Sequence, residues 1–369
     1  MAGATGRGLV PWRPPFSLLK GPIAAYLLVG ALTAGAAALV ALYVDRPPSV
    51  TEVAAMAAGP ARPRISSLKL PFRQADPLAF RTFSLAERDD MLEDTPDGRL
   101  PKVSSTGWTP WIANARRFDP EGPAARVGLL MINVGANEAL MERAIEELPG
   151  EVSLAFLAGT PDLPRWMKRA HARDHETYLM MPVDEPDGVG ERGIRPIDPR
   201  TPIAENVRRL RVALARGEGY VGVVMSTVGE IAKSDDLNAP LMKEIADRGL
   251  GLIEIDPGGT QSPMARLASE LGVGYARTST VLDYKLARNG IGGNLDRLTQ
   301  WTGETWPGRP PRHDFGVLQP DAQAIDAIVA WRRRLAQQTT VAFAPVIGHF
   351  ECRTVCMERL RIQPQQLRP

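Results

Sequence analysis

Soft metal ligands are scarce in this sequence of 369 residues, and neither sign of charge dominates it. The chain contains four histidines and two cysteines, so a transition-metal site would have few side chains from which to be built. Its 44 Lys and Arg residues nearly balance its 42 Asp and Glu residues, which leaves a formal net charge of +2. Nucleic acid binding needs clustered cationic side chains. The composition therefore gives no electrostatic support for a nucleic acid partner.

Charge is absent altogether from residues 21–44, an apolar run rich in small side chains. A helix of this length can cross the roughly 30 Å hydrocarbon core of a membrane. Arg7, Arg13 and Lys20 precede the run, and a basic flank stays on the cytoplasmic side. The sequence thus predicts a cytoplasmic segment at 1–20, then a single transmembrane anchor in the bacterial inner membrane, with the C-terminal domain in the periplasm. A cleaved signal peptide is the main alternative.

Regular apolar periodicity is missing from residues 45–123, which are punctuated by prolines. Proline removes a backbone donor and interrupts both helices and central strands. We therefore expect a Pro-rich linker or arm here rather than a packed domain. Trp108 and Trp111 lie near its end and could pin the last part onto the following domain, although ordinary surface packing explains them equally well.

Strand and helix patterns alternate about seven times over residues 124–348. Continuous apolar runs suit strands buried on both faces, and amphipathic stretches suit the helices that cover them. The expected strands are 127–134, 152–157, 177–183, 220–226, 251–255, 272–276, 280–282, 315–318 and 340–346. The expected helices are 138–147, 162–172, 204–216, 239–248, 264–271, 295–302 and 321–336. This α/β alternation predicts a parallel sheet, either open or closed into a barrel.

Six stretches in the same order resemble the divergent polysaccharide deacetylase family over residues 126–345. They are LPGEVSLAF (148–156), HETYLMMPVDEP (175–186), ENVRRLRVALARGEGYVGV (205–223), ADRGLGLIEI (246–255), ARLASELGV (265–273) and VLDYKL (281–286). The resemblance implies a deformed seven-stranded β/α barrel. For active members it implies removal of acetyl groups from amino sugars with the help of zinc.

The metal-site motifs of that family are the parts that this sequence lacks. Where the family ends its first strand with two adjacent Asp residues, this chain has Ile132 and Asn133. Where the family supplies two imidazoles after later strands, this chain has Ser226 and Leu318, and Glu254 replaces a further Asp. Aliphatic side chains cannot bind a metal, and an asparagine carbonyl binds one only weakly. We therefore expect no cofactor.

Carboxylates still gather at the predicted strand ends. Glu185, Glu254, Asp256 and Asp283 lie at or just beyond strands and, together with Asn133, are the candidate cleft residues. Since the C-terminal strand ends of a β/α barrel meet at one mouth, two carboxylates there could bind sugar hydroxyls or perform acid–base chemistry. Ordinary surface acids at the start of loops are the alternative.

The histidines are weaker candidates for a metal site. His171 and His175 have the i, i+4 spacing that can chelate, but no Glu stands between them. They also lie away from the strand ends at which a barrel site would form. His313 and His349 are expected to be solvated loop residues.

Cys352 and Cys356 lie in the C-terminal tail, residues 349–369. In an oxidising compartment they could form a disulfide, and two free thiols are the other main possibility. A weak metal pair with His349 is a third. The sequence does not choose among these.

Two functions fit these observations. In the first, the protein is a non-catalytic relative of the deacetylases that binds a cell-envelope glycan or an envelope protein. In the second, it is an active N- or O-deacetylase with a rebuilt site. The loss of the metal-site side chains favours the first. An open doubly wound sheet that binds a small ligand fits the periodicity but not the ordered motifs.

Overall fold

The computed structural model describes residues 83–116, 118, 125–183, 193–227, 234–259, 262–306, 309, 311–338 and 340–351. All of them belong to one unit, Lys69–Pro369. The predicted anchor at 21–44, the candidate Glu185 and both cysteines lie outside the described residues. Within the part of the chain that the structure describes, no helix is long and apolar enough to span a membrane.

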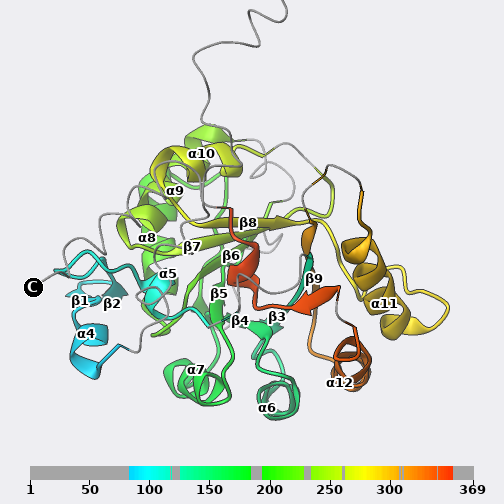
Figure 1. Ribbon diagram of the computed structural model, residues 1–369. Helices are drawn as coiled ribbons and strands as arrows, with labels where there is room; N and C mark the ends of the chain where they lie inside the picture. Colours follow the sequence, from blue (N-terminus) through cyan, green and yellow to red (C-terminus); the bar gives the residue numbers. More distant parts are fainter. Residues whose placement is uncertain are drawn as a thin grey trace, which may run out of the picture. The chain divides into compact units, whose positions relative to one another are not determined.

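Parallel strands run through the centre of the molecule (Figure 1). Hydrogen-bonded neighbours follow the order β9 (His313–Leu318), β3 (Ala125–Val134), β4 (Val152–Leu157), β5 (Thr177–Met180), β6 (Gly222–Ser226), β7 (Gly251–Ile255) and β8 (Tyr275–Thr278). Beyond β8 the chain returns to β9 through a single parallel bridge between Val281 and Val317. A further strand, β10 (Val341–Phe343), pairs with the start of β3. The seven strands form a near-barrel parallel sheet, consistent with the expected β/α barrel.

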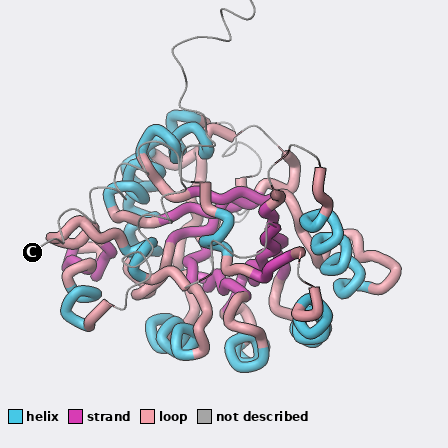
Figure 2. The backbone as a smooth tube through the Cα atoms, in the orientation of Figure 1, coloured by secondary structure: helices cyan, strands magenta, loops and turns pink. Residues whose placement is uncertain are grey.

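Helices surround the sheet (Figures 1 and 2). They are α6 (Glu138–Glu147), α7 (Leu163–Ala172), α8 (Ile203–Leu214), α9 (Asp235–Asp247), α10 (Met264–Leu271), α11 (Gly290–Gly303) and α12 (Ala322–Leu335). Side-chain caps start some of them: Asn137 Oδ1 accepts from the Leu140 N–H at 3.0 Å, and Asp321 Oδ1 accepts from the Gln323 N–H at 2.8 Å. Such caps satisfy backbone donors that have no partner inside the helix.

Alternation along the strands divides the core into two layers. Leu129 and Leu252 belong to the outer layer, between the sheet and the helices. Leu130, Tyr178 and Ile253 belong to the inner layer, inside the barrel. Each fully buried aliphatic side chain contributes about 1.5–3 kcal/mol to stability. Because side chains fill the interior, a ligand can reach the barrel only near the ends of its strands.

The part of the expected linker or arm that the structure describes, residues 83–116, contains helices and strands. This segment, which we call the arm, contains α4 (Leu85–Asp89), the antiparallel pair β1 (Leu92–Thr95) and β2 (Gly98–Pro101), and α5 (Pro110–Ala113). Trp108 and Trp111 are buried, and the Trp111 ring stacks on Phe350 with 5.9 Å between centroids. Isolated large apolar residues dock the arm without any periodic pattern, and the two tryptophans were the local sign of this packing.

A buried carboxyl group closes the N-terminal ends of the strands, an end of the barrel that we call the floor. Glu176 is fully buried, and its carboxylate accepts from the Arg116 N–H (3.0 Å), Ser153 Oγ (3.0 Å), the Tyr178 hydroxyl (3.1 Å) and the Ile347 N–H (3.3 Å). Burial raises the pKa of Glu176 to about 7, and the four donors oppose this rise. The floor therefore joins the arm, β4, β5 and the C-terminal 3₁₀ turn η5 (Val346–His349).

Candidate functional site

The C-terminal ends of the strands form the mouth of the barrel, opposite the floor. At this end β3 is irregular, because its register with β4 shifts between Met131 and Val134. Asn133 lies in this irregular stretch with φ +56°, a left-handed conformation that Asn tolerates better than most residues. Gly135 follows with φ +106°, and a Cβ there would lie 2.0 Å from Thr160 Oγ1. This local backbone geometry fixes where the Asn133 side chain sits.

Three polar side chains, which we call the mouth cluster, are linked at this end: Asn133, Asp283 and Gln319. Asn133 Nδ2 donates to Gln319 Oε1 at 3.4 Å, and the Gln319 N–H donates to Asp283 Oδ2 at 2.8 Å. Asn133 and Asp283 are half-buried and Gln319 is exposed. Two of the sequence candidates are thus brought together. Sequence reasoning missed Gln319, although its position directly after β9 would have identified it had amides been considered with carboxylates.

Glu254 lies on the helix-facing side of β7. Its strand neighbour Leu252 and its partner Tyr275 both belong to the outer layer. Its carboxylate accepts from Thr227 Oγ1 at 2.5 Å and from the hydroxyls of Ser262 and Tyr275. Glu254 is fully buried, and three hydroxyl donors satisfy it. Glu254 is therefore buried between the sheet and the helices and does not belong to the mouth cluster.

Asp256 is a buried partner in an ion pair. Its carboxylate binds the guanidinium of Arg277, whose side chain is 34 % exposed. The Asp256 N–H donates to the Thr278 carbonyl at 2.9 Å, which extends the pairing of β7 and β8. Since breaking a buried pair leaves an uncompensated charge, Asp256 is suited to holding the two strand ends together.

The side chains at the strand ends do not fit the zinc that the family resemblance implies. Ile132 packs against the inner layer, and the Asn133 amide is bound to Gln319. Ser226 presents only a hydroxyl, and Leu318 is buried in the outer layer. Zinc takes thiolate, imidazole or carboxylate ligands, and none of these four positions supplies one. Within the described ranges, no group of three His, Cys, Asp or Glu side chains could hold a metal ion.

His171 and His175 have other partners. His175 Nδ1 lies 2.8 Å from the Val152 carbonyl oxygen, and its Nε2 lies 3.2 Å from that of Ile145. His171 Nε2 lies 3.1 Å from Thr177 Oγ1. Burial lowers the pKa of both imidazoles, that of His171 to about 4. Both side chains thus help to dock α7 and the following turn onto the sheet.

His349 corrects the expectation of a solvated loop histidine, and His313 is exposed as expected but begins strand β9 instead of lying in a loop. Both ring nitrogens of His349 are buried and have no hydrogen-bond partner among the described residues. Its ring centroid lies 5.5 Å from that of Phe315, and burial lowers its pKa to about 3. Gly128 makes room for the ring, since a Cβ there would lie 2.6 Å from Nε2. The segment after β10 turns under the barrel and carries His349 with it.

Two solved structures are similar to this chain. An uncharacterized protein of Agrobacterium tumefaciens C58 shares the fold with a TM-score of 0.59 and 24 % identity, over 68 % of this chain and 99 % of that one. A protein of Enterococcus faecalis V583 named for cellobiose-phosphate cleavage has a TM-score of 0.41 and 10 % identity, over 60 % of this chain and 97 % of that one. No match was found among curated proteins. The model of one family matches residues 130–346, more than half of the sequence. The chain belongs to the divergent polysaccharide deacetylase family.

Proposed function

We propose that this protein binds a cell-envelope glycan at the mouth of its barrel and does not catalyse metal-dependent deacetylation. The mouth cluster carries the proposal. Its amide and carboxylate groups can accept from sugar hydroxyls, and its amide N–H groups can donate to them. Tyr284, which follows Asp283, is 66 % exposed and offers an aromatic face to the apolar side of a sugar ring.

The chemistry of the strand ends supports binding rather than hydrolysis. Metal-dependent deacetylation needs a Lewis acid to polarise the acetyl carbonyl or to generate a hydroxide nucleophile. Ile132 and Ser226 stand where the family resemblance implies a carboxylate and an imidazole. A hydrolase rebuilt around other groups is the competing function, and the experiment below separates the two.

We further propose that residues 21–44 anchor the protein in the bacterial inner membrane and that the barrel faces the periplasm. This proposal rests on the uncharged apolar run and on the basic residues that precede it. In that location, the glycan available to the mouth cluster is that of the cell envelope.

The test measures glycan binding by the full chain in detergent. The probes are sedimentation with purified peptidoglycan and calorimetric titration with chitohexaose. Gln319→Ala should weaken binding about 2- to 10-fold, because one hydrogen bond contributes about 0.5–1.5 kcal/mol. Asp283→Asn should also weaken binding. Arg333→Gln is the control, since this exposed residue lies on α12.

Two results would contradict the proposal. In one, the wild-type chain fails to bind either probe. In the other, protein incubated with zinc and then dialysed retains one equivalent of metal and releases acetate from chitohexaose. The second result would establish the rebuilt hydrolase.

A further inference from the structure

A concave surface lies at the floor end of the barrel, away from the mouth. It is a groove of about 1260 Å³ between α4, β1 and β2 of the arm on one side and α7 and the turn at residues 218–220 on the other. Figure 1 shows where these elements lie. Small-molecule pockets typically measure about 300–1000 Å³. This larger groove, which we call the arm groove, therefore suits an extended chain.

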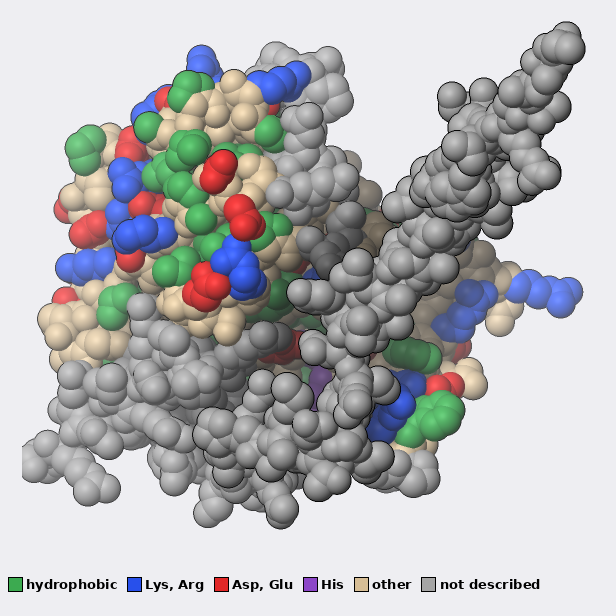
Figure 3. Space-filling model, turned by 90° about the horizontal axis from the view of Figure 1, so that it is seen from above, with side chains coloured by type: hydrophobic (Ala, Val, Ile, Leu, Met, Phe, Trp, Pro, Cys, Tyr) green, Lys and Arg blue, Asp and Glu red, His purple; other side chains and the backbone are tan. Residues whose placement is uncertain are grey.

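The arm groove carries more positive charge than its own carboxylates neutralise. Five Lys or Arg side chains and three carboxylates line it. Arg99 already pairs with two of those carboxylates, Asp89 and Glu218. The side chains of Arg165 and Lys168 are exposed on α7 and have no ion-pair or hydrogen-bond partner among the described residues. Elsewhere, as on the face in Figure 3, basic and acidic side chains lie interspersed.

Two arginines of the arm are held at the groove, and one of them, Arg116, is already ion-paired, since its Nη2 lies 4.0 Å from Glu151 Oε1. Arg88 Nη1 donates to Asn114 Oδ1 at 2.8 Å, and Asn114 Nδ2 donates in turn to the Tyr220 carbonyl at 3.1 Å. Arg116 Nη1 donates to the Asp174 carbonyl at 2.6 Å, and its Nε is buried without a partner in the described part of the chain. A guanidinium has five N–H groups, so Arg88 keeps donors for a carboxylate after binding Asn114. Their position is set before any ligand arrives.

Apolar side chains form the rest of the wall. Leu85 on α4 is 87 % exposed, and small or cyclic residues line the groove beside it: Ala86, Pro110, Ala113, Ala115 and Pro164. The aromatic side chain in the described lining is that of Tyr220, which is only 1 % exposed. A sugar polymer would find no open aromatic face here, whereas apolar side chains of a peptide could pack on Leu85.

The terminal segments of this chain do not complement the groove. Residues 45–82 carry six basic and three acidic residues, and residues 352–369 carry four arginines and one glutamate. Both segments have the same sign of net charge as the groove. Neither of these segments is therefore the acidic occupant that the groove would attract.

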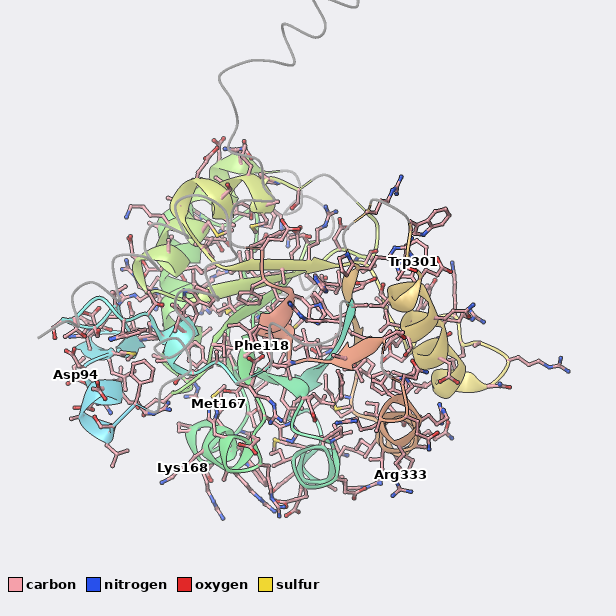
Figure 4. The ribbon with its side chains drawn as sticks, in the orientation of Figure 1. Asp94, Phe118, Met167, Lys168, Trp301 and Arg333 are labelled. Carbon is pink, nitrogen blue, oxygen red and sulfur yellow. The ribbon has the colours of Figure 1, made fainter. Side chains whose placement is uncertain are left out.

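We propose that the arm groove binds an extended acidic peptide segment of a partner protein. Arg165 and Lys168 bind its carboxylates from the α7 wall, Arg88 binds them from the arm, and Leu85 packs against an apolar side chain of the peptide. Figure 4 shows the two sides of α7: Met167 points toward the sheet, and Lys168 points away from it.

The test is fluorescence anisotropy with the full chain in detergent and a fluorescein-labelled dodecapeptide of repeated Glu-Glu-Leu. The wild type should bind this peptide saturably, and more weakly as salt screens the charges. The double variant Arg165→Gln/Lys168→Gln should bind it at least about tenfold more weakly, because a tenfold loss corresponds to about 1.4 kcal/mol for two charged contacts. A Glu-Glu-Ser peptide should bind more weakly than the Leu peptide, since it lacks the side chain that packs on Leu85.

The matched control is Arg297→Gln/Arg333→Gln, which removes two exposed charges from α11 and α12 and should bind like the wild type. Binding of chitohexaose should be the same in all these variants, so the arm groove and the mouth are tested separately. Three results would overturn the proposal: no saturable binding below millimolar peptide, equal binding by the α7 double variant, or equal binding of a Lys-Lys-Leu peptide. Loss of binding to phosphatidylglycerol vesicles in the α7 variant, without peptide binding by the wild type, would assign the groove to a membrane instead.

Discussion

Replacing Glu176 with glutamine isolates the energetic effect of the buried carboxyl group at the floor. Burial raises the pKa of Glu176 from 4.5 to about 7 in the folded protein. Between these two values the folded state binds one more proton than the unfolded state. By linkage, this proton makes the free energy of unfolding fall by about 1.4 kcal/mol for each pH unit. Over the whole interval, the fall amounts to about 3 kcal/mol.

The sign follows from the direction of the pKa change. A carboxyl group whose pKa is raised by folding stabilises the protein fully below pH 4.5, and this contribution is lost as the pH rises to about 7. The E176Q variant has no proton to exchange in this interval. Its amide N–H groups will face the donors around the carboxylate and lower its stability, but by an amount that does not depend on pH. The difference in unfolding free energy, wild type minus E176Q, should therefore decrease by about 3 kcal/mol from pH 4.5 to pH 7.5.

Urea unfolding of the full chain in detergent, followed by tryptophan fluorescence at several pH values, measures this difference. Arg333→Gln is the control for substitution as such, because it removes no carboxyl group. Its unfolding free energy should change with pH in the same way as that of the wild type. The reasoning fails if the unfolding free energies of E176Q and the wild type differ by the same amount at every pH. The four hydrogen bonds to Glu176 would then offset the effect of burial completely.

Three substitutions test the packing around the barrel. Gly135→Ala should lower the urea midpoint by the equivalent of more than about 2 kcal/mol, because φ is +106° and the new Cβ would lie 2.0 Å from Thr160 Oγ1. Trp111→Ala should lower the free energy of unfolding by about 3–5 kcal/mol and make the arm susceptible to limited proteolysis. If the variant resists proteolysis as well as the wild type does, the arm does not depend on this contact. Trp331→Phe removes the N–H donated to Thr299 Oγ1 at 2.9 Å and should lower stability by about 1 kcal/mol in the same urea assay.

The barrel could be predicted from the sequence because its elements have strong patterns. The ranges 138–147, 152–157, 251–255 and 264–271 agree with the helices and strands of the structure at both ends. Strands buried on both faces give unbroken apolar runs, and helices that cover a sheet give an apolar stripe. Closure of the sheet had no such signal, since it depends on a single bridge between Val281 and Val317 that is distant in sequence.

The candidate site was harder to predict because one residue of strand register decides which layer a side chain enters. Glu254 and Asp256 lie at the end of β7, yet Glu254 faces the helices and Asp256 is paired with Arg277. At the end of β9 the same alternation buries Leu318 in the outer layer and leaves Gln319 at the mouth. A local sequence pattern does not show which residues of other strands a polar side chain will contact.

The arm and the C-terminal turn, at the two ends of the part of the chain that the structure describes, both attach at the floor, and this determines how mechanical tension would pass through it. A pull on the chain ahead of Phe83 would pass into the arm and load the Trp111–Phe350 stack and the bond between the Arg116 N–H and Glu176. The C-terminal turn reaches the same carboxylate through the Ile347 N–H, so tension from either end converges on one buried residue. The mouth cluster lies at the other end of the strands, outside this load path. A glycan held there would remain gripped while the floor and the arm yielded first.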